Sequence, residues 1–348
     1  MITDPLIRNP YNIINIGIAY EIGRGCSLVE TIESLESGLR IGHVGLGYRG
    51  EVAGSVRQEV HDGDTIKTKP IGYLSIRFLG IDTPEISFQL PGSKYFTGLS
   101  NQSWIDFLAD PFASKWQQPT MDQGLIDYLK EKTGQDTAKN HHDHAVSAEK
   151  ALESEVMNDI AKLNQTKDSF QFFLTFADEI MDRYGRLLSY VNRNQPEATV
   201  PEIRPRPYNE RLLEMGLASP YFIFPNVSPF LTMSLEDNNE ISPSKFRGTI
   251  KQDNALQTAR ESVRKARELG DGIGIFNKSD PLKLQAFEIR FLAQRRLPNR
   301  WIIDLSKDDD ILIKPQKYYL ITKLENRFYV PYKYVSLFVE SGWKRQST

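Results

Sequence analysis

Alternating apolar and polar residues dominate the stretch of chain that begins at Glu51. The segments EVAGSVRQEV, IKTKP and YLSIRFLGI each follow the period of two that is typical of half-buried strands, and the turn-like HDGDT separates the first two. In the third segment Arg77 falls on the opposite face from Phe78, and the proline that follows ends the strand close to Asp82. The pattern therefore predicts successive antiparallel strands, with Asp82 and Glu85 at the exit of the last one.

Apolar residues at helical spacing predict helices in other parts of the chain. The first helix starts at a Ser-x-x-Glu capping box, Ser27 with Glu30, and is expected to extend to about Leu39. Further helices are predicted at about 104–112, 124–134, 145–163, 209–216 and 255–270. Residues 222–250, rich in Pro, Ser, Asn and Asp, predict a long surface excursion.

These elements predict an α+β fold in three parts. Residues 1–50 form an N-terminal extension with one helix, and residues 51–277 form the main domain, with insertions at about 87–140 and 222–250. The insertion at 87–140 is expected to be helical. Residues 278–348 are dense in aromatic and β-branched residues and predict a small β-rich C-terminal domain.

Composition limits the classes of partner. With 40% hydrophobic and 25% charged residues the chain has the composition of a soluble globular protein, and its formal charge of -2 excludes a globally basic nucleic-acid binder. A polyanion would have to be held by a local cluster of Arg and Lys. The single cysteine, Cys26, excludes internal disulfides.

The N-terminal residues show neither a basic segment followed by a long apolar run nor a membrane span. We therefore expect no membrane partner and a cytoplasmic location, with virion association or non-classical export as open alternatives.

Three motifs in series resemble the staphylococcal nuclease (thermonuclease) family. They are HDGDT at 61–65, RFLGIDTPE at 77–85 and DRYGR at 182–186. The segment NERLLEMGLA and the alanine-rich helix ending near Gly270 also stand where that family has helices. The resemblance covers about 51–89, 141–221 and 251–277. It implies a five-stranded OB-type β-barrel with packed helices.

The resemblance also implies roles for individual residues. Asp64, Asp82 and the Thr83 carbonyl would ligate Ca²⁺, with Mg²⁺ or Mn²⁺ as alternative ions. Arg77 and Arg186 would hold the scissile phosphate, Glu85 would activate the attacking water, and Arg183 with Tyr184 would contact a neighbouring phosphate. A tyrosine that approaches the phosphate in the family has its nearest counterpart in Tyr221, one residue out of register, so Tyr221 is not assigned to the site.

The same residue types suit phosphodiester hydrolysis on chemical grounds. A phosphodiester repels nucleophiles by its own negative charge, so a catalyst must neutralise the phosphoryl oxygens and deliver an oriented water. Guanidinium forks and a carboxylate at the end of one strand can do both. The sequence thus predicts a metal-dependent endonuclease acting on DNA, RNA or both. The alternative is a non-catalytic OB-fold module that binds nucleic acid or protein in a larger assembly.

Two features of the sequence leave partners and a second metal open. The insertion and the C-terminal region could each dock a protein partner. The run HHDH at 141–144 holds three of the five histidines and could bind a metal, but it also fits a polar loop before the next helix.

Overall fold

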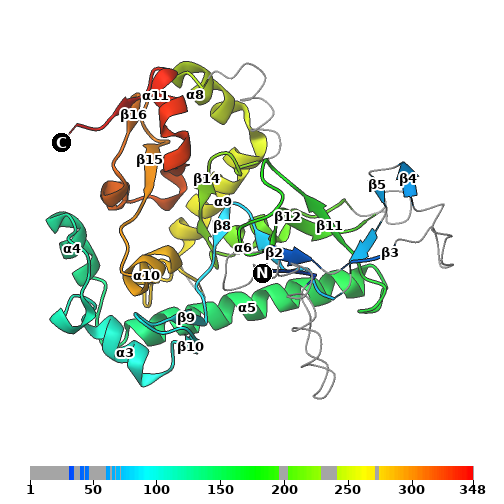
Figure 1. Cartoon of the computed structure of the whole chain (residues 1–348), viewed down its shortest axis with the longest axis horizontal. Helices are drawn as coiled ribbons and strands as arrows, with labels where there is room; N and C mark the ends of the chain where they lie inside the picture. The colour runs from blue at the N-terminus through cyan, green and yellow to red at the C-terminus, as the bar shows by residue number, and fades with distance from the viewer. Residues whose placement is uncertain are drawn as a thin grey trace, which may run out of the picture. The chain divides into compact units, whose positions relative to one another are not determined.

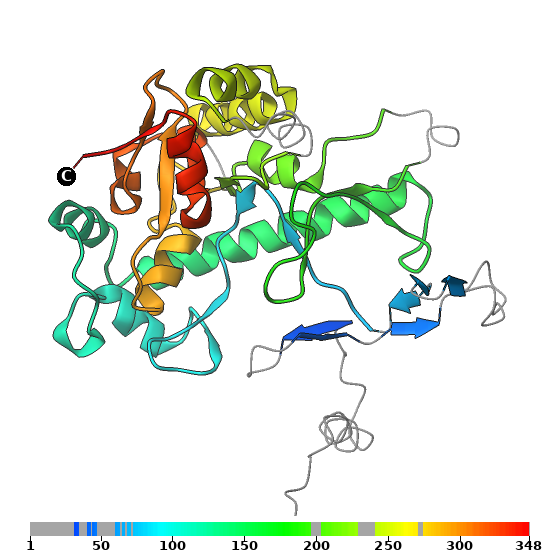
Figure 2. The same cartoon turned by 45° about the horizontal axis from the view of Figure 1, so that its top comes forward.

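The computed structural model describes residues 31–34, 40–42, 44–46, 60–62, 65–66, 68–70, 72–195, 203–228, 241–270 and 274–347. They form a mixed α+β structure of helices and several small sheets (Figures 1 and 2). The chain divides into a smaller unit, Met1–Ile76 with Met181–Leu187, and a larger unit, Arg77–Ile180 with Leu188–Thr348. The domain boundaries expected after residues 50 and 277 stay predictions.

The described strands of the smaller unit form short antiparallel pairs. The pairs are β1 (Ile32–Ser34) with β2 (Arg40–Gly42), β3 (Val44–Leu46) with β6 (Thr68–Pro70), and β4 (Val60–Asp62) with β5 (Thr65–Ile66). The helix predicted over residues 27–39 is therefore wrong for Ile32–Ser34. Its apolar spacing is outweighed by pairing with distant backbone, since the Thr31 N–H also donates to the Tyr73 carbonyl at 2.7 Å.

Helices account for much of the larger unit. They are α3 (Gln102–Ala109), α4 (Gln123–Lys130), α5 (Thr137–Lys162), α6 (Tyr208–Glu214), α8 (Pro243–Gln252), α9 (Asn254–Leu269), α10 (Ala286–Ala293) and α11 (Val335–Glu340). The five helices predicted between residues 104 and 270 are confirmed, although α5 begins at Thr137 rather than at Ala145. Gly216 and Gly270 end α6 and α9 with positive φ angles of 68° and 53°, as predicted.

The strands belonging to the larger unit form several separate sheets. The sheets are β11 (Phe172–Thr175), β12 (Leu187–Arg193) and β7 (Ile76–Phe78); β8 (Ile81–Asp82) with β13 (Ser219–Pro220); β9 (Ser87–Gln89) with β10 (Phe96–Gly98); β14 (Phe222–Ile223), β17 (Arg327–Pro331) and β15 (Arg300–Asp304); and β16 (Ile311–Leu312) with β18 (Lys344–Arg345). Within the residues described, none of these sheets closes into a barrel, so the OB-type barrel is not confirmed.

Two predictions for the second half of the chain need correction, one of them only in part. Residues 222–250 do not form a surface excursion where they are described, because Phe222, Phe224 and Val227 are buried and α8 begins at Pro243. The β-rich C-terminal prediction holds for RWIID, IL and RFYVP, which form β15, β16 and β17. It is wrong for KYYL, which lies in the 3-10 helix η3 (Pro315–Leu320), and for VSLFV, which forms most of α11. Dense apolar and aromatic residues fit a buried helix as well as a buried strand.

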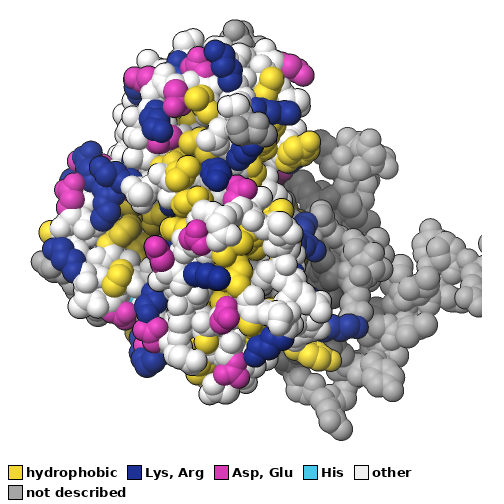
Figure 3. All heavy atoms as spheres, turned by 90° about the vertical axis from the view of Figure 1, so that its left-hand side faces the viewer, with side chains coloured by type: hydrophobic (Ala, Val, Ile, Leu, Met, Phe, Trp, Pro, Cys, Tyr) yellow, Lys and Arg dark blue, Asp and Glu magenta, His cyan; other side chains and the backbone are white. Residues whose placement is uncertain are grey.

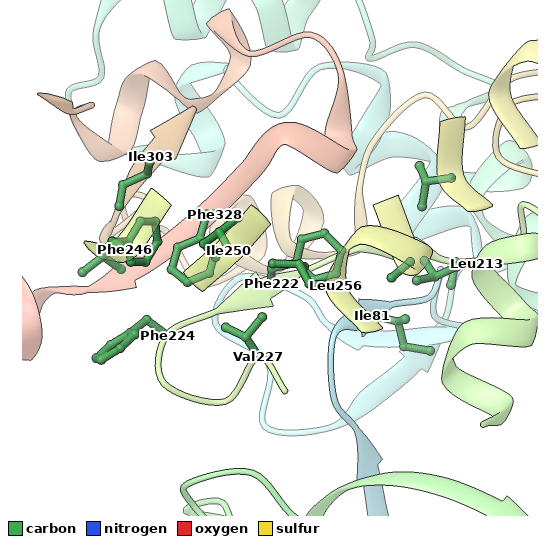
Figure 4. Packing of buried hydrophobic residues seen from close by; sticks show 14 of the residues in the cluster. Ile81, Leu213, Phe222, Phe224, Val227, Phe246, Ile250, Leu256, Ile303 and Phe328 are labelled. Atoms are coloured by element: carbon green, nitrogen blue, oxygen red, sulfur yellow. The ribbon is translucent and has the colours of Figure 1, made fainter. Parts of the chain in front are cut away.

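Two clusters of buried hydrophobic side chains hold the larger unit together. In the first, Phe246 of α8 packs edge-on against Phe328 of β17 with ring centroids 5.0 Å apart, beside Ile250 and Phe222 (Figure 4). The second joins side chains of α3, α4 and α10. Residues of the C-terminal segment 274–347 contribute to both clusters. Each fully buried large apolar side chain contributes about 1.5–3 kcal/mol, so both clusters stabilise this unit substantially.

The turn between β7 and β8 requires glycine at position 80. Gly80 has a φ of 74°, and a Cβ there would lie 2.8 Å from the Tyr190 hydroxyl oxygen. We expect Gly80→Ala to lower the free energy of unfolding by about 1–3 kcal/mol. Gly248→Ala is the matched control, because a methyl group at this position of α8 meets nothing within 4 Å. It should stabilise by about 0.5–1 kcal/mol. Urea unfolding measures both, and an unchanged stability of Gly80→Ala would contradict this account of the turn.

Candidate functional site

The turn after β7 brings Arg77 and Asp82 together. Leu79 and Gly80 form the turn between β7 and β8, and β8 pairs with β13, where Ser219 lies opposite Asp82. Asn209 of α6 braces the turn, because its side-chain amide donates to the Leu79 carbonyl at 2.9 Å. The single strand predicted over YLSIRFLGI is therefore wrong at Leu79 and Gly80, and the turn there is held by backbone pairing and by a buried amide.

Four charged side chains meet at this exit. Arg77 Nη2 donates to Asp82 Oδ1 at 2.5 Å, and Arg290 Nη2 donates to Asp82 Oδ2 at 2.6 Å. Arg290 Nη1 also donates to Glu85 Oε1, and Arg77 Nη1 lies 4.0 Å from the same oxygen. We call Arg77, Asp82, Glu85 and Arg290 the charge cluster. Its two carboxylates and two guanidiniums carry charges that sum to zero.

Burial differs sharply within the charge cluster. The Asp82 side chain is 2% exposed, whereas those of Arg77, Arg290 and Glu85 are 27%, 28% and 29% exposed. The aspartate therefore forms the floor of the cluster, and the two guanidiniums and the glutamate reach solvent. Only these three side chains can meet a ligand that arrives from water.

The pKa values of the two carboxyl groups shift in opposite directions. For Asp82, burial is the largest influence and disfavours the charge, but Arg290 and Arg77 outweigh it and hold the pKa below its usual 3.8. For Glu85, burial is again the largest influence, and with the nearby Asp82 charge it raises the pKa above its usual 4.5 against the opposing arginines. Asp82 is thus the firmly ionised anchor, and Glu85 is the better proton acceptor.

His141 connects the charge cluster to α5. Its Nε2 accepts a hydrogen bond from the Glu85 backbone N–H at 3.1 Å, and its Nδ1 lies 3.0 Å from the Leu284 carbonyl. The two partners require a neutral ring that carries its proton on Nδ1. Burial, the main cause, lowers the His141 pKa to about 3. Through His141, α5 thereby fixes the backbone at Glu85 and at Leu284, which lies just before α10.

Tyr221 also lies close to the cluster. Its backbone N–H donates to the Gly80 carbonyl at 2.8 Å, and its hydroxyl accepts a hydrogen bond from Arg300 Nη1 at 2.7 Å. Burial is the largest cause that raises the Tyr221 pKa, and the Asp82 charge adds to it while Arg300, Arg290 and Arg77 oppose it. A tyrosine that the sequence left unassigned is thus within electrostatic reach of the site.

The other predicted site residues have different locations. Thr83 follows Asp82 in the larger unit and is half-buried. Arg183, Tyr184 and Arg186 belong to the smaller unit, and Asp64 lies outside the described residues. The structure therefore brings together Arg77, Asp82 and Glu85 from the predicted set.

In the smaller unit, DRYGR forms a turn organised by Asp182. The Arg186 side chain donates to Asp182 Oδ2 through Nε and Nη2, both at 2.8 Å, and the Tyr184 N–H donates to Asp182 Oδ1 at 2.8 Å. Tyr184 is 53% exposed, and its ring lies beneath the Arg183 guanidinium at 4.7 Å. The turn presents an aromatic ring and two cations, a combination compatible with binding an anion.

Of the expected calcium ligands, Asp82 and Thr83 are described and Asp64 is not. Both Asp82 oxygens already accept from guanidiniums, and no group of three or more His, Cys, Asp or Glu suited to a metal occurs in the described part of the chain. The HHDH run lies inside α5 rather than in a loop, so the loop prediction is wrong. Its His141 ring is committed to Glu85 and Leu284, and His144 Nε2 lies 3.0 Å from the Asp280 carbonyl.

Sequence reasoning missed Arg290, which makes two of the charge cluster's contacts. It stands within AFEIRFLA, an apolar stretch outside all three motifs, and no local pattern distinguishes it from a surface arginine. Its pairing with Glu85 joins residues 205 positions apart. Such a partner becomes visible only in the folded structure.

Comparisons with known proteins found no relative of this chain. No family model matches the chain, and neither a curated protein nor a solved structure matches it. Among the described helices, none has the length and apolar character needed to cross a membrane. The site must therefore be interpreted from its own residues.

The buried neutral His141 should make stability depend on pH. Because its folded pKa of about 3 lies below the usual 6.5, the unfolded chain binds the extra proton, and stability should fall as the pH decreases from 6.5 toward 3. His141→Gln can keep both hydrogen bonds but cannot titrate. Between pH 7 and pH 5 the wild-type protein should lose about 2 kcal/mol more stability than this variant in urea unfolding.

His142→Gln serves as the control for this comparison, since its ring is 27% exposed. It should keep the wild-type pH dependence. If His141→Gln and the wild-type protein lose stability in parallel, the neutral buried ring is not the source of the pH dependence.

Proposed function

We propose that the larger unit carries a site that hydrolyses phosphodiester bonds in DNA, RNA or both. The observation that supports it is that Arg77, Asp82 and Glu85, which one motif assigned to a phosphodiesterase site, lie in one charge cluster with a second arginine. For water to attack a phosphodiester, cations must neutralise the phosphoryl oxygens and a carboxylate must accept the proton of the water. All of these groups must reach solvent at the same place.

Each exposed member of the cluster has a chemical role in this proposal. A guanidinium has five N–H donors, so Arg77 keeps donors for the phosphoryl oxygens while Nη2 holds Asp82. Glu85, with its raised pKa, accepts the proton of the attacking water. The water oxygen bonds to phosphorus while the P–O bond to the leaving oxygen breaks, and the leaving oxygen takes a proton from solvent. Asp82 orients both guanidiniums from beneath. The negative charge on the phosphoryl oxygens is then stabilised by groups that are already in place.

Other parts of the resemblance remain predictions within this proposal. They are the phosphate-binding roles of Arg183, Tyr184 and Arg186, and the OB-type barrel. The calcium site of Asp64, Asp82 and Thr83 is the alternative source of positive charge, and calcium titrations distinguish it from the arginines of the charge cluster. Residues 51–59, which that barrel requires, lie outside the described part of the chain. The proposed chemistry depends only on the charge cluster.

The charge distribution favours attraction of a nucleic acid by a few side chains at the site rather than by the protein surface as a whole. The formal charge of the chain is -2, and on the face shown in Figure 3 basic and acidic side chains are interspersed. That face has no broad basic surface to steer a polyanion. The phosphate would instead be selected at the site by the partly exposed guanidiniums, which are 27% and 28% exposed.

The second candidate is a module that binds nucleic acid or protein without turnover. One observation favours it: the four charges of the charge cluster already satisfy one another, as in an ion-pair network that only joins a strand exit to a helix. Such networks exist in proteins without catalytic activity at that position. Cleavage measurements distinguish the two candidates.

Replacing Glu85 by Gln should abolish the proton acceptor while retaining the shape of the side chain. We expect the cleavage rate to fall by about 10²–10⁴-fold, with little change in the affinity for nucleic acid. The rate is measured on single- and double-stranded DNA and RNA, and the affinity by fluorescence anisotropy of labelled oligonucleotides.

Glu153→Gln is the matched control, because Glu153 is exposed on α5 outside the cluster. It should cleave at the wild-type rate. If the wild-type protein binds oligonucleotides without cleaving them, the second candidate is correct. If Glu85→Gln loses binding and cleavage equally, Glu85 supports the structure rather than the chemistry.

A further inference from the structure

We propose that the Arg290 guanidinium takes the place that a divalent cation would otherwise hold at Asp82, so that the site works without a bound metal ion. This inference rests on the proposed function for its catalytic part and goes beyond it by naming the source of positive charge. It concerns Arg290, a residue of α10 that lies outside every motif of the sequence.

Both carboxylate oxygens of Asp82 already accept hydrogen bonds from positively charged side chains. Arg77 donates to one oxygen at 2.5 Å and Arg290 to the other at 2.6 Å, and the side chain is 2% exposed. Calcium needs six to eight oxygen ligands around it. Here the space on the polar side of Asp82 is taken by two guanidiniums, which are themselves donors and repel a cation.

The charge balance leads to the same conclusion. Arg77 and Arg290 contribute two positive charges, and Asp82 and Glu85 contribute two negative charges, so the charge cluster is neutral without a metal. A divalent ion would give these four residues a net charge of +2 next to a buried carboxylate. Burying unpaired charge is costly, so the ion could bind only by displacing a guanidinium.

Arg290 is firmly positioned for this role. In α10, Ile289 and Leu292 have no exposed surface, and the Glu288 carboxylate accepts from the Gln285 N–H at 2.7 Å and the Tyr318 hydroxyl at 2.8 Å. The helix is therefore anchored on both sides of the arginine. Displacing the guanidinium from Asp82 would require either a change of its rotamer into solvent or movement of a packed helix.

A guanidinium can perform the electrostatic work expected of a cation at a phosphate. It is permanently charged, and its planar fork matches the oxygens of a phosphoryl group. Arg290 uses Nη1 for Glu85 and Nη2 for Asp82, and it is 28% exposed. It thus places a positive charge beside the carboxylate that accepts the proton, without any metal ligand.

The test compares the wild-type protein with Arg290→Ala, and with Arg296→Ala as a control for the loss of an exposed arginine just beyond the same helix. Calcium binding is measured by isothermal titration calorimetry, and cleavage is measured in excess EDTA and in calcium. The wild-type protein and Arg296→Ala should bind no calcium at Asp82 and should cleave equally in EDTA and in calcium.

Arg290→Ala should lose about 10²–10³-fold in cleavage in EDTA, the size of effect expected for one preorganised charge donor. It should also gain a calcium site that disappears in the double variant Asp82→Asn with Arg290→Ala. If Arg290→Ala does not fold by its melting curve, Arg290→Lys replaces it. The lysine keeps the charge, so we expect it to bind no calcium and to cleave in EDTA about 10-fold more slowly.

Several results would overturn the inference. They are calcium binding by the wild-type protein that Asp82→Asn removes, wild-type cleavage that EDTA abolishes and calcium restores, or an Arg290→Ala variant that behaves like Arg296→Ala. Absence of cleavage by the wild-type protein under every condition would contradict the proposed function instead. In that case the calcium titrations alone would still decide whether Arg290 holds the place of the cation.

Discussion

The larger unit depends on a buried aspartate that must remain charged. Asp82 is almost fully removed from water, and such a carboxylate is stable only if cations replace its hydration. Arg77 comes from the adjacent strand and Arg290 from a helix more than two hundred positions later. Breaking a buried pair by removing one partner typically costs about 3–5 kcal/mol, so the fold must keep these three elements together.

This constraint explains how the C-terminal segment is attached. The helix α10 has to present Arg290 to Asp82, and the residues that begin it bond to α5 and β13: His141 meets the Leu284 carbonyl, and the Ser219 hydroxyl donates to Gln285. In Figures 1 and 2 the N-terminal half of α5 passes beside α10. The same packing buries side chains from the insertion and the C-terminal segment in one cluster.

The requirements of stability and of the proposed chemistry coincide in the charge cluster. The buried, charged Asp82 holds two guanidiniums beside the Glu85 carboxylate at the surface. These groups need not move during the reaction, and such a preorganised arrangement stabilises developing charge. The opposite pKa shifts of Asp82 and Glu85 separate an anchoring carboxylate from a proton acceptor. Because the network is neutral without a metal, we propose that Arg290 supplies the positive charge that a divalent ion would otherwise provide at Asp82.

The sequence by itself determined what local spacing controls. The period of two predicted a strand through Arg77, although a turn at Leu79 and Gly80 puts Asp82 on the next strand. Helical spacing with glycine caps located α6 and α9, because these signals involve neighbours within a few residues. The tertiary structure alone decided that 32–34 is a strand, that α10 and η3 are helical, and that Arg290 and His141 join the site. Those outcomes depend on backbone pairing, burial and charge neutralisation between residues far apart in the chain, and no local pattern records them.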